Sequence, residues 1–289
     1  MGVRLPYEIK ARAKLNLTLD VLGCREDGYH DLRMVMQSVQ LCDTITLEEG
    51  KTPDIRVRSN LGFLPNDRRN LAAAAALAFC EQTGQTCPPL DITLDKVIPV
   101  CAGLGGGSSD AAAVLHAMNH ICGTGLSPEQ LAVIGEKVGS DVPYCVLGGT
   151  ALAEGRGEVL TALPPLPKCW VALCKPDFSV STPALFHQID SVRLRRRPDT
   201  EGVLKALHEG DLPGVARRLY NVFEDALPER YAAKVEQVKH VFIQHGALGA
   251  AMSGTGSAVF GLFDKEEQAK QACDELREQY PETFLTQTV

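Results

Sequence analysis

The 289-residue chain lacks several features that mark particular classes of protein. No apolar run reaches the roughly 20 residues that a membrane-spanning helix needs, so we expect no membrane partner. The first residues contain neither the apolar core of a secretion signal nor a transit segment, and we therefore expect a cytoplasmic location. The formal net charge of −7 argues against nucleic acid as a partner, because nucleic-acid-binding proteins carry a basic surface.

The ten cysteines lack the spacing of a redox pair or a zinc site. None is arranged as C-x-x-C, and most lie in apolar stretches such as residues 169–174. We therefore expect buried free thiols in a reducing compartment rather than a disulfide framework. We identify no metal ligand among the side chains.

Glycine, by contrast, is concentrated in one loop. Four of the five residues 103–107 are glycines, which leaves backbone N–H groups open to a bulky anion. Ser108, Ser109 and Asp110 are typical of a helix start, and apolar residues at helical spacing follow over 111–122. Because a helix N-terminus attracts negative charge, the pattern predicts a site for a nucleotide triphosphate. The residues of this phosphate loop are Pro99, Val100, Cys101, Ala102, Gly103, Leu104, Gly105, Gly106, Gly107, Ser108 and Ser109.

Two other phosphate-binding patterns do not fit this loop. A Walker loop requires a lysine, and none lies between Gly103 and Ser109. The dinucleotide fingerprint has a third glycine where this chain has Ser108, and it usually opens the first βαβ unit of a domain. A tight glycine-rich connection without a ligand is the structural alternative, but ordering so many glycines costs backbone entropy.

The patterns along the rest of the chain predict an α+β fold, because strands and helices are mixed without strict βαβ repetition. Residues 7–21 alternate between apolar and polar side chains, which is typical of a strand. Ser127 and Gln130 form a capping box at the start of a helix that we expect Gly139 to end. Further strands are predicted at 34–41, 44–47, 91–96, 169–174 and 258–263, and further helices at 70–80 and 264–280.

The length of the chain predicts two domains, since it exceeds the usual size of one compact core. After Ala151 the residue composition changes, and three prolines at 164–167 precede a predicted strand. We predict an N-terminal ATP-binding domain at 1–160 and a C-terminal substrate-side domain at 161–289. The pattern leaves open whether the last strand returns to the first domain.

Two charged residues are candidates for the chemistry of phosphoryl transfer, which needs a base for the acceptor hydroxyl. Asp141 is a candidate base, although an aspartate before a short helix is equally typical of an N-cap. Lys14 lies on the polar face of the first strand, either as a solvated edge residue or as a cation that holds a carboxylate ionised. The sequence does not show whether the two residues meet.

An aromatic residue next to an imidazole, Tyr29 and His30, follows a turn at Asp27 and Gly28. Such a pair is able to stack on and hydrogen-bond a base or a sugar, and a surface turn with a packed tyrosine is the alternative. The basic run over 193–197 is interpreted as a solvated loop rather than as a phosphate contact.

Six segments together resemble the superfamily of galactokinase, homoserine kinase, mevalonate kinase and phosphomevalonate kinase (GHMP). The phosphate loop by itself is typical of the whole superfamily. Gly28, Tyr29 and His30, taken with residues 140–143, are more specific and resemble the kinases of the non-mevalonate isoprenoid route. In chain order, the six segments are 13–17, 27–30, 99–109, 140–143, 153–158 and 253–256.

The resemblance implies a two-domain GHMP-kinase-like α+β fold with the active site in the cleft between the domains. It also implies transfer of the γ-phosphoryl group of ATP to the 2-hydroxyl of 4-diphosphocytidyl-2-C-methylerythritol, with Asp141 as general base and Lys14 as its charged partner. Mg²⁺ is expected to accompany ATP, held mostly by phosphates and water. Both a monomer and a homodimer are consistent with the sequence.

The resemblance further assigns binding roles on the substrate side. Asn16 would contact the substrate near its reacting end. Tyr29 and Phe186 would sandwich the cytosine, and His30 would hydrogen-bond the edge of that base. The segment that contains Phe186 matches more loosely than the others.

On the nucleotide side, the resemblance places Asn70 and Lys96 along the adenine. Two alternatives stay open at this point. One is another GHMP kinase, acting on homoserine, mevalonate or a sugar, and the other is a non-catalytic nucleotide-binding regulator on the same fold.

Overall fold

The computed structural model describes residues 5–52 and 54–289, and these fall into two compact units built from discontinuous segments. Unit 1 comprises the described residues of Met1–Ala13, Cys42–Val100 and Gly105–Gly148. Unit 2 comprises Lys14–Leu41, Cys101–Leu104 and Gly149–Val289. Two long strands, β1 (Tyr7–Cys24) and β2 (His30–Glu49), each have residues in both units.

Unit 1 combines short strands with four helices in its described part. Strand β4 pairs antiparallel with the Thr44–Glu49 part of β2 and parallel with β3. The further elements of this unit are β3 (Ile55–Ser59), α1 (Leu71–Thr83), β4 (Leu90–Asp95), α2 (Gly106–Cys122), α3 (Pro128–Glu136) and α4 (Val142–Leu147).

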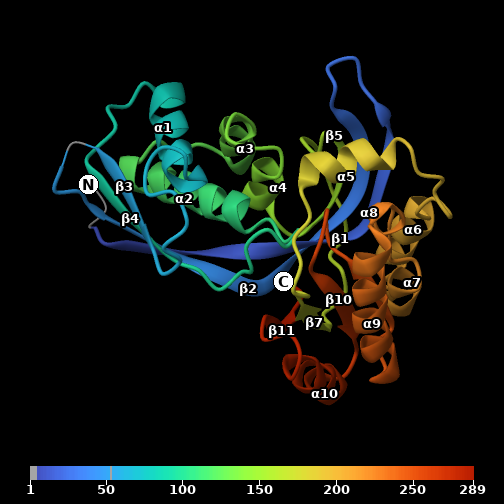
Figure 1. Ribbon diagram of the computed structural model, residues 1–289. Helices are drawn as coiled ribbons and strands as arrows, with labels where there is room; N and C mark the ends of the chain where they lie inside the picture. The colour runs from blue at the N-terminus through green and yellow to red at the C-terminus, as the bar shows by residue number, and fades with distance from the viewer. Residues whose placement is uncertain (1–4, 53) are drawn as a thin grey trace. The chain divides into compact units, whose positions relative to one another are not determined.

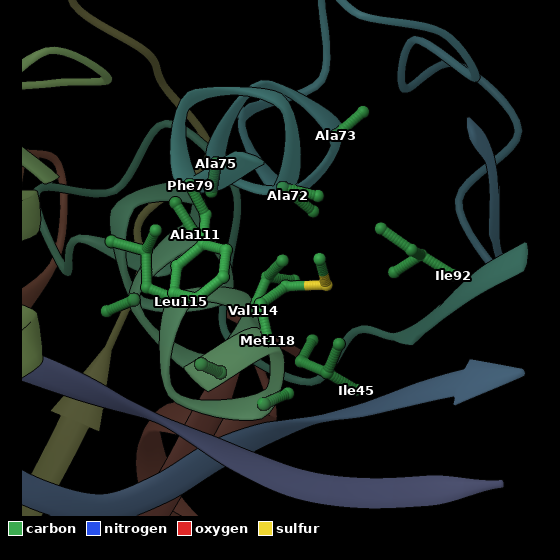
Figure 2. Packing of buried hydrophobic residues seen from close by; sticks show 14 of the residues in the cluster. Ile45, Ala72, Ala73, Ala75, Phe79, Ile92, Ala111, Val114, Leu115 and Met118 are labelled. Atoms are coloured by element: carbon green, nitrogen blue, oxygen red, sulfur yellow. The ribbon is translucent and has the colours of Figure 1, made fainter. Parts of the chain in front are cut away.

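The core of unit 1 lies between helices α1 and α2 and the strands β2 and β4 (Figures 1 and 2). Helix α1 is rich in alanine on its buried side, so its backbone packs close to α2 without side chains in the way. Phe79 fills the space beside this small-residue face, and Ile45 and Ile92 contribute the strand side of the core.

Unit 2 contains a four-stranded antiparallel sheet among its described residues, with strand order β11-β7-β10-β9. Helix α9 packs against β9 and β10, and α10 packs against β7, β10 and β11 (Figure 1). In this unit β5 also pairs with β2 and with β6, and β8 pairs with β1. The further elements are β5 (Thr150–Gly155), β6 (Val159–Ala162), β7 (Trp170–Cys174), α5 (Thr182–Ile189), α6 (Thr200–Glu209), α7 (Leu212–Ala216), β8 (Tyr220–Asn221), α8 (Phe223–Ala226), α9 (Glu229–Gln244), β9 (Gly249–Met252), β10 (Val259–Phe263), α10 (Glu266–Arg277) and β11 (Thr283–Gln287).

The predicted strands and helices are confirmed, with differences at their ends. The capping box of Ser127 and Gln130 is present at the start of α3, but that helix ends at Glu136, three residues before Gly139. The two strands predicted at 34–41 and 44–47 form one continuous strand, β2. The last strand, β11, pairs with β7 in unit 2. The domain boundary at 160/161 stays a prediction.

The prediction for the cysteines is correct for part of the set only. Cys80, Cys169, Cys174 and Cys273 are buried. Burial raises the pKa of the Cys169 and Cys174 thiols to about 12, which keeps both protonated. Cys24 and Cys101 are exposed: Cys24 is the last residue of β1, and Cys101 lies in a turn. No helix in the described part of the chain is both long and apolar enough to span a bilayer.

Candidate active site

The unit 1 part of the phosphate loop is the N-terminus of helix α2. The helix begins at Gly106, before the serines that were expected to start it, because Gly105 adopts a left-handed conformation (φ 68°) and serves as N-cap. No side chain caps this end, so the first-turn N–H groups are not taken by a capping oxygen. The start of a 17-residue helix with such an end favours negative charge, and phosphate binding there stays a prediction.

Ser108 and Ser109 were expected to cap the helix, and this interpretation is wrong because both lie inside its first turn. Ser109 is buried, and its hydroxyl donates a hydrogen bond of 2.5 Å to the carbonyl of Arg12 on β1. Ser108 is half-buried. The second serine therefore fixes the helix to a strand instead of satisfying its end.

The unit 2 part of the loop, Cys101–Leu104, is held by a second glycine-rich turn at 253–257. The Ser253 hydroxyl donates to the carbonyl of Gly103 over 2.9 Å, and the Ala258 amide donates to the carbonyl of Ala102 over 3.1 Å. Gly103 has a φ of 76°, and a Cβ atom there would lie 2.0 Å from the Ser253 carbonyl oxygen. Only glycine fits this position.

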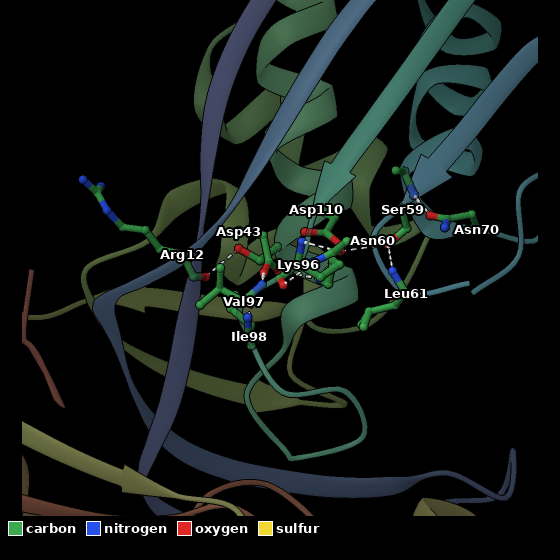
Figure 3. Close-up of polar contacts among 12 residues, drawn as sticks. Arg12, Asp43, Ser59, Asn60, Leu61, Asn70, Lys96, Val97, Ile98 and Asp110 are labelled. Atoms are coloured by element: carbon green, nitrogen blue, oxygen red, sulfur yellow. Dashed lines mark hydrogen bonds and ion pairs between the residues drawn. The ribbon is translucent and has the colours of Figure 1, made fainter. Parts of the chain in front are cut away.

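Directly before the loop, Lys96 lies buried between two carboxylates, and we call these three residues the buried ion cluster (Figure 3). Its Nζ donates to Asp43 on β2 over 2.5 Å and to Asp110 on α2 over 2.6 Å. Asp43 also accepts from the amides of Val97 and Ile98, at 2.6 and 2.8 Å. The cluster therefore joins a strand, the start of the loop and the helix behind it.

The two carboxylates of the buried ion cluster differ in how they are stabilised. Asp43 accepts two backbone hydrogen bonds as well as one from the ammonium. Asp110 is buried and its Oδ1 has no hydrogen-bond partner. Burial raises the pKa of Asp110 to about 7, against the opposing effect of Lys96. Asp110 therefore holds a proton to a higher pH than an ordinary carboxyl group does.

Asn70 and Lys96, the two residues expected along the adenine, have structural partners. The Asn70 side chain caps α1 by accepting from the Ala72 amide over 3.0 Å, and it donates to the carbonyl of Pro65. The Asn60 side chain makes two hydrogen bonds to the backbone of Lys96: its Nδ2 donates to the Lys96 carbonyl, and its Oδ1 accepts from the Lys96 amide. Contact of either residue with adenine stays a prediction.

In unit 2, Lys14 and Asn16 adjoin the second glycine-rich turn. Lys14 is only 4% exposed, so the solvated-edge interpretation is wrong. Its Nζ donates to Asn16 Oδ1 over 2.8 Å. Asn16 Oδ1 also accepts from the backbone amide of Gly254, and the backbone amide of Asn16 donates to the Ser253 hydroxyl. The Asn16 side chain therefore links the ammonium to the second glycine-rich turn.

Asp141, the candidate base, is a half-buried residue of unit 1 at the N-cap position of α4. Its side chain makes no capping hydrogen bond. The reason lies in the backbone, which is helical at Asp141 (φ −85°, ψ −11°) instead of extended as a capping residue requires. The capping interpretation is therefore wrong for the side chain, and the role of base stays a prediction.

The structure brings together two of the residues expected around the cytosine. The rings of His30 and Phe186 have centroids 5.0 Å apart, and Phe186 packs edge-on against Phe223. His30 Nε2 lies 2.8 Å from a carboxylate oxygen of Asp190. Tyr29 is 55% exposed, and the Arg156 guanidinium lies 5.1 Å from its ring centroid. All of these residues belong to unit 2.

Sequence reasoning assigned no role to three residues that hold the candidate site. Asp43 and Asp190 each orient a predicted site residue, and Ser253 bonds to both Asn16 and the phosphate loop. Asp43 is the only charged residue in 34–47, and this isolated charge in a strand region was a signal for a buried ion pair. The glycines next to Ser253 were a signal for a close backbone approach. Asp190, at the end of a short helix, had no signal.

Comparison with known proteins places the chain in a family. Sequence profiles match over residues 70–149 for the "GHMP kinases N terminal domain" and over residues 203–282 for the "GHMP kinases C terminal" domain. The chain is 43% identical over 281 residues to a 4-diphosphocytidyl-2-C-methyl-D-erythritol kinase of Alkaliphilus metalliredigens (strain QYMF), covering 97% of this chain and 96% of the relative. The chain belongs to the GHMP kinase family.

Solved structures agree with this assignment. A crystal structure of 4-(cytidine 5'-diphospho)-2C-methyl-D-erythritol kinase superposes with a TM-score of 0.81 at 33% identity, covering 98% of this chain and 99% of that one. The homoserine kinase from Cytophaga hutchinsonii ATCC 33406 has a TM-score of 0.76 at 19% identity, with 100% and 96% coverage, and shows the shared fold. The predicted α+β GHMP-kinase-like fold is confirmed. As a GHMP kinase, the protein is a phosphotransferase that uses ATP as co-substrate.

Proposed function

We propose that this GHMP kinase phosphorylates the 2-hydroxyl of 4-diphosphocytidyl-2-C-methyl-D-erythritol, a step of the non-mevalonate route to isoprenoid precursors. The observation that carries the proposal is identity above 40% over nearly the whole chain to relatives named as kinases of this compound. Kinases named for homoserine or mevalonate resemble the chain at 19% identity or less among the solved structures compared. That level supports the fold and not the acceptor.

For ATP, we propose that the phosphates lie at the N-terminus of α2, where no side-chain cap competes for the amides. Among the described residues, no group of three or more His, Cys, Asp or Glu side chains is arranged to hold a metal ion. We propose that Mg²⁺ is bound mainly through the phosphates and water, because this ion loses its water shell reluctantly. The ion would offset charge on the phosphates.

For the proton transfer, we propose Asp141 as the general base, with Lys14 as the cation that favours its ionised form. Two observations support these roles. The Asp141 side chain is not used to cap α4, and Lys14 is buried with its ammonium held by Asn16. A buried, oriented ammonium is well suited to stabilise developing negative charge on an acceptor oxygen.

For the acceptor, we propose that cytosine packs against Phe186, with His30 bonding its edge and Tyr29 on its other face. The carboxylate of Asp190 supports this role of His30, since a hydrogen bond at one ring nitrogen fixes the tautomer and the orientation of the other. Asn16, beside Lys14, would contact the reacting end.

The test is to incubate the protein with Mg-ATP and the diphosphocytidyl compound and to measure ADP release. Homoserine, mevalonate and a sugar serve as competing acceptors, and we expect the cytidine compound to be preferred at least 100-fold. Asp141→Asn is expected to lower kcat by at least 1000-fold while the acceptor still binds. The exposed Asp264→Asn serves as the matched control and should turn over normally.

Two outcomes would overturn these assignments separately. A preference for homoserine or mevalonate would reject the proposed acceptor, and rapid turnover by the Asp141 variant would reject the proposed base. Tight ATP binding with no acceptor consumed would favour the non-catalytic regulator instead. The cytoplasmic location and the choice between monomer and homodimer stay predictions.

A further inference from the structure

A polar cavity, which we call the arginine cavity, lies in unit 2 and has no residue of the phosphate loop in its lining. Its volume is about 310 Å³, at the small end of the range for ligand pockets. Four of its lining side chains are cationic and one is anionic, within a chain whose net charge is −7. The lining residues are Arg196, Arg197, Asp199, Arg217, Arg218 and Tyr220.

Two of these arginines come from the basic run that was interpreted as a solvated loop. Arg197 donates to Asp20 Oδ1 over 2.6 Å and to the carbonyl of Val21 over 2.5 Å, so it is tied to strand β1. The Arg196 guanidinium lies 4.3 Å from the centroid of the Tyr220 ring. Both residues are exposed and lie in a loop, which confirms the interpretation as a solvated loop, although their guanidinium groups have fixed partners.

A third arginine is fixed from the other side of the cavity. Arg218 donates through Nε to Asp199 over 2.7 Å and through Nη1 to the carbonyl of Gly214 over 2.8 Å. Arg217 has a looser partner, since its Nη2 lies 3.9 Å from the carboxylate of Asp211. Preordered side chains lose less conformational entropy when a ligand binds.

The arginines retain donors after these contacts. A guanidinium has five N–H donors, and the hydrogen bonds of Arg197 are made through one terminal nitrogen. Arg196 has a ring contact, which leaves its N–H edge available. The carboxylates therefore position three of the arginines and offset most of their formal charge, while N–H donors remain for a ligand.

We propose that the arginine cavity binds the diphosphate group of a small phosphorylated molecule. Guanidinium groups match phosphate oxygens in a bidentate geometry, and this cavity has arginine and no lysine among its lining residues. When Asp20 and Asp211 are counted with Asp199, the four arginines keep one formal positive charge, and their remaining N–H donors suit the several oxygens of a diphosphate. Its small volume suits the anionic head of a ligand rather than a whole nucleotide.

The test is calorimetric titration of the full chain with inorganic pyrophosphate while a saturating non-hydrolysable ATP analogue occupies the phosphate loop. The double variant Arg196→Gln/Arg217→Gln is expected to weaken binding at least 10-fold, because it removes the two cations with the fewest fixed contacts. Arg230→Gln is the matched control, since Arg230 packs on the Tyr231 ring as Arg196 packs on Tyr220 but does not line the cavity. The control should change the affinity less than 2-fold.

Further titrations show which ligand and which site produce the calorimetric binding signal. Malonate should bind at least 10-fold more weakly than pyrophosphate, and equal affinities would overturn the preference for phosphate. The diphosphocytidyl compound added alone should retain its affinity in the double variant, which separates this cavity from the proposed acceptor site. Absence of pyrophosphate binding, or binding that the double variant leaves unchanged while its thermal unfolding matches the parent, would overturn the proposal.

Discussion

In the Cys101–Leu104 half of the phosphate loop, neutral backbone and hydroxyl groups make the bonds that hold the chain, whereas the half beginning at Gly105 is held by a buried ion cluster. Ser253 and Ala258 fix the first half through carbonyl oxygens of the loop. Lys96 holds the second half through the carboxylate of Asp110.

The difference shows what each kind of contact demands of the sequence. Neutral bonds to backbone require that two chains approach closely, so glycine is the critical residue there. A buried ion cluster requires complete pairing, because one charge left without its partner in a dry site is costly. The following predictions test this contrast in order of decreasing expected effect.

The largest effect is expected for Lys96→Met, which leaves Asp43 and Asp110 facing each other without a cation. Removing one member of a buried ion pair costs about 3–5 kcal/mol of the free energy of unfolding. Denaturant unfolding measures this loss. As a control, Lys234→Met breaks a pair with Asp177 on the surface and should cost less than about 1 kcal/mol. Similar losses in both variants would contradict the importance of burial.

For the neutral half, Gly103→Ala is expected to cost about 2–4 kcal/mol, because the positive φ is strained for alanine and the new Cβ meets the Ser253 carbonyl. Gly84→Ala separates the two causes, since Gly84 has a φ of 65° but nothing within 4 Å of its Cβ position. Gly84→Ala should lower the free energy of unfolding by only about 1 kcal/mol. Thermal and denaturant unfolding would measure both, and equal costs would refute the steric argument.

The charged half should also carry a pH dependence that the neutral half lacks. The native pKa of Asp110 is raised to about 7 from an ordinary value of 3.8, so the folded state binds a proton that the unfolded state has released over this window. The contribution of this group to stability is therefore complete below about pH 4 and is lost as pH rises through 7. This loss gives the free energy of unfolding a slope of about 1 kcal/mol per pH unit, and Asp110→Asn should remove that slope.

Denaturant unfolding at several pH values between 4 and 8 measures this slope in both proteins. The parent and the Asp110 variant should then differ mainly between pH 4 and 7. Parallel curves over that interval would show that Asp110 ionises normally in the folded protein.

The smallest effect is expected for Ser109→Ala, which removes the hydrogen bond to the carbonyl of Arg12 and leaves the charges intact. The cost should be about 1 kcal/mol, the usual contribution of a neutral hydrogen bond. Ser108→Ala, at the half-buried neighbouring position, should change the free energy of unfolding by less than about 0.5 kcal/mol. A larger loss at Ser108 than at Ser109 would contradict the assignment of the anchoring role.

Much of the fold was predictable because local patterns carry it. The alternation over 7–21, the capping box at Ser127 and the alanine-rich stretch after Asn70 all correspond to elements of the structure. The predictions failed where a position depends on distant segments. The serines expected to cap α2 lie within the helix, and the polar face of β1 is buried at Lys14.

By itself, the sequence determined the element types, the glycine loop before a helix and the family to which its motifs point. These depend on residue spacing and on the conformations that glycine allows, which are properties of neighbouring residues. Only the tertiary structure decided that Lys96 lies between Asp43 and Asp110, that Ser253 holds Gly103, and that separate arginines line one cavity. Such contacts join residues far apart in the chain, and their strength depends on burial, which no local pattern encodes.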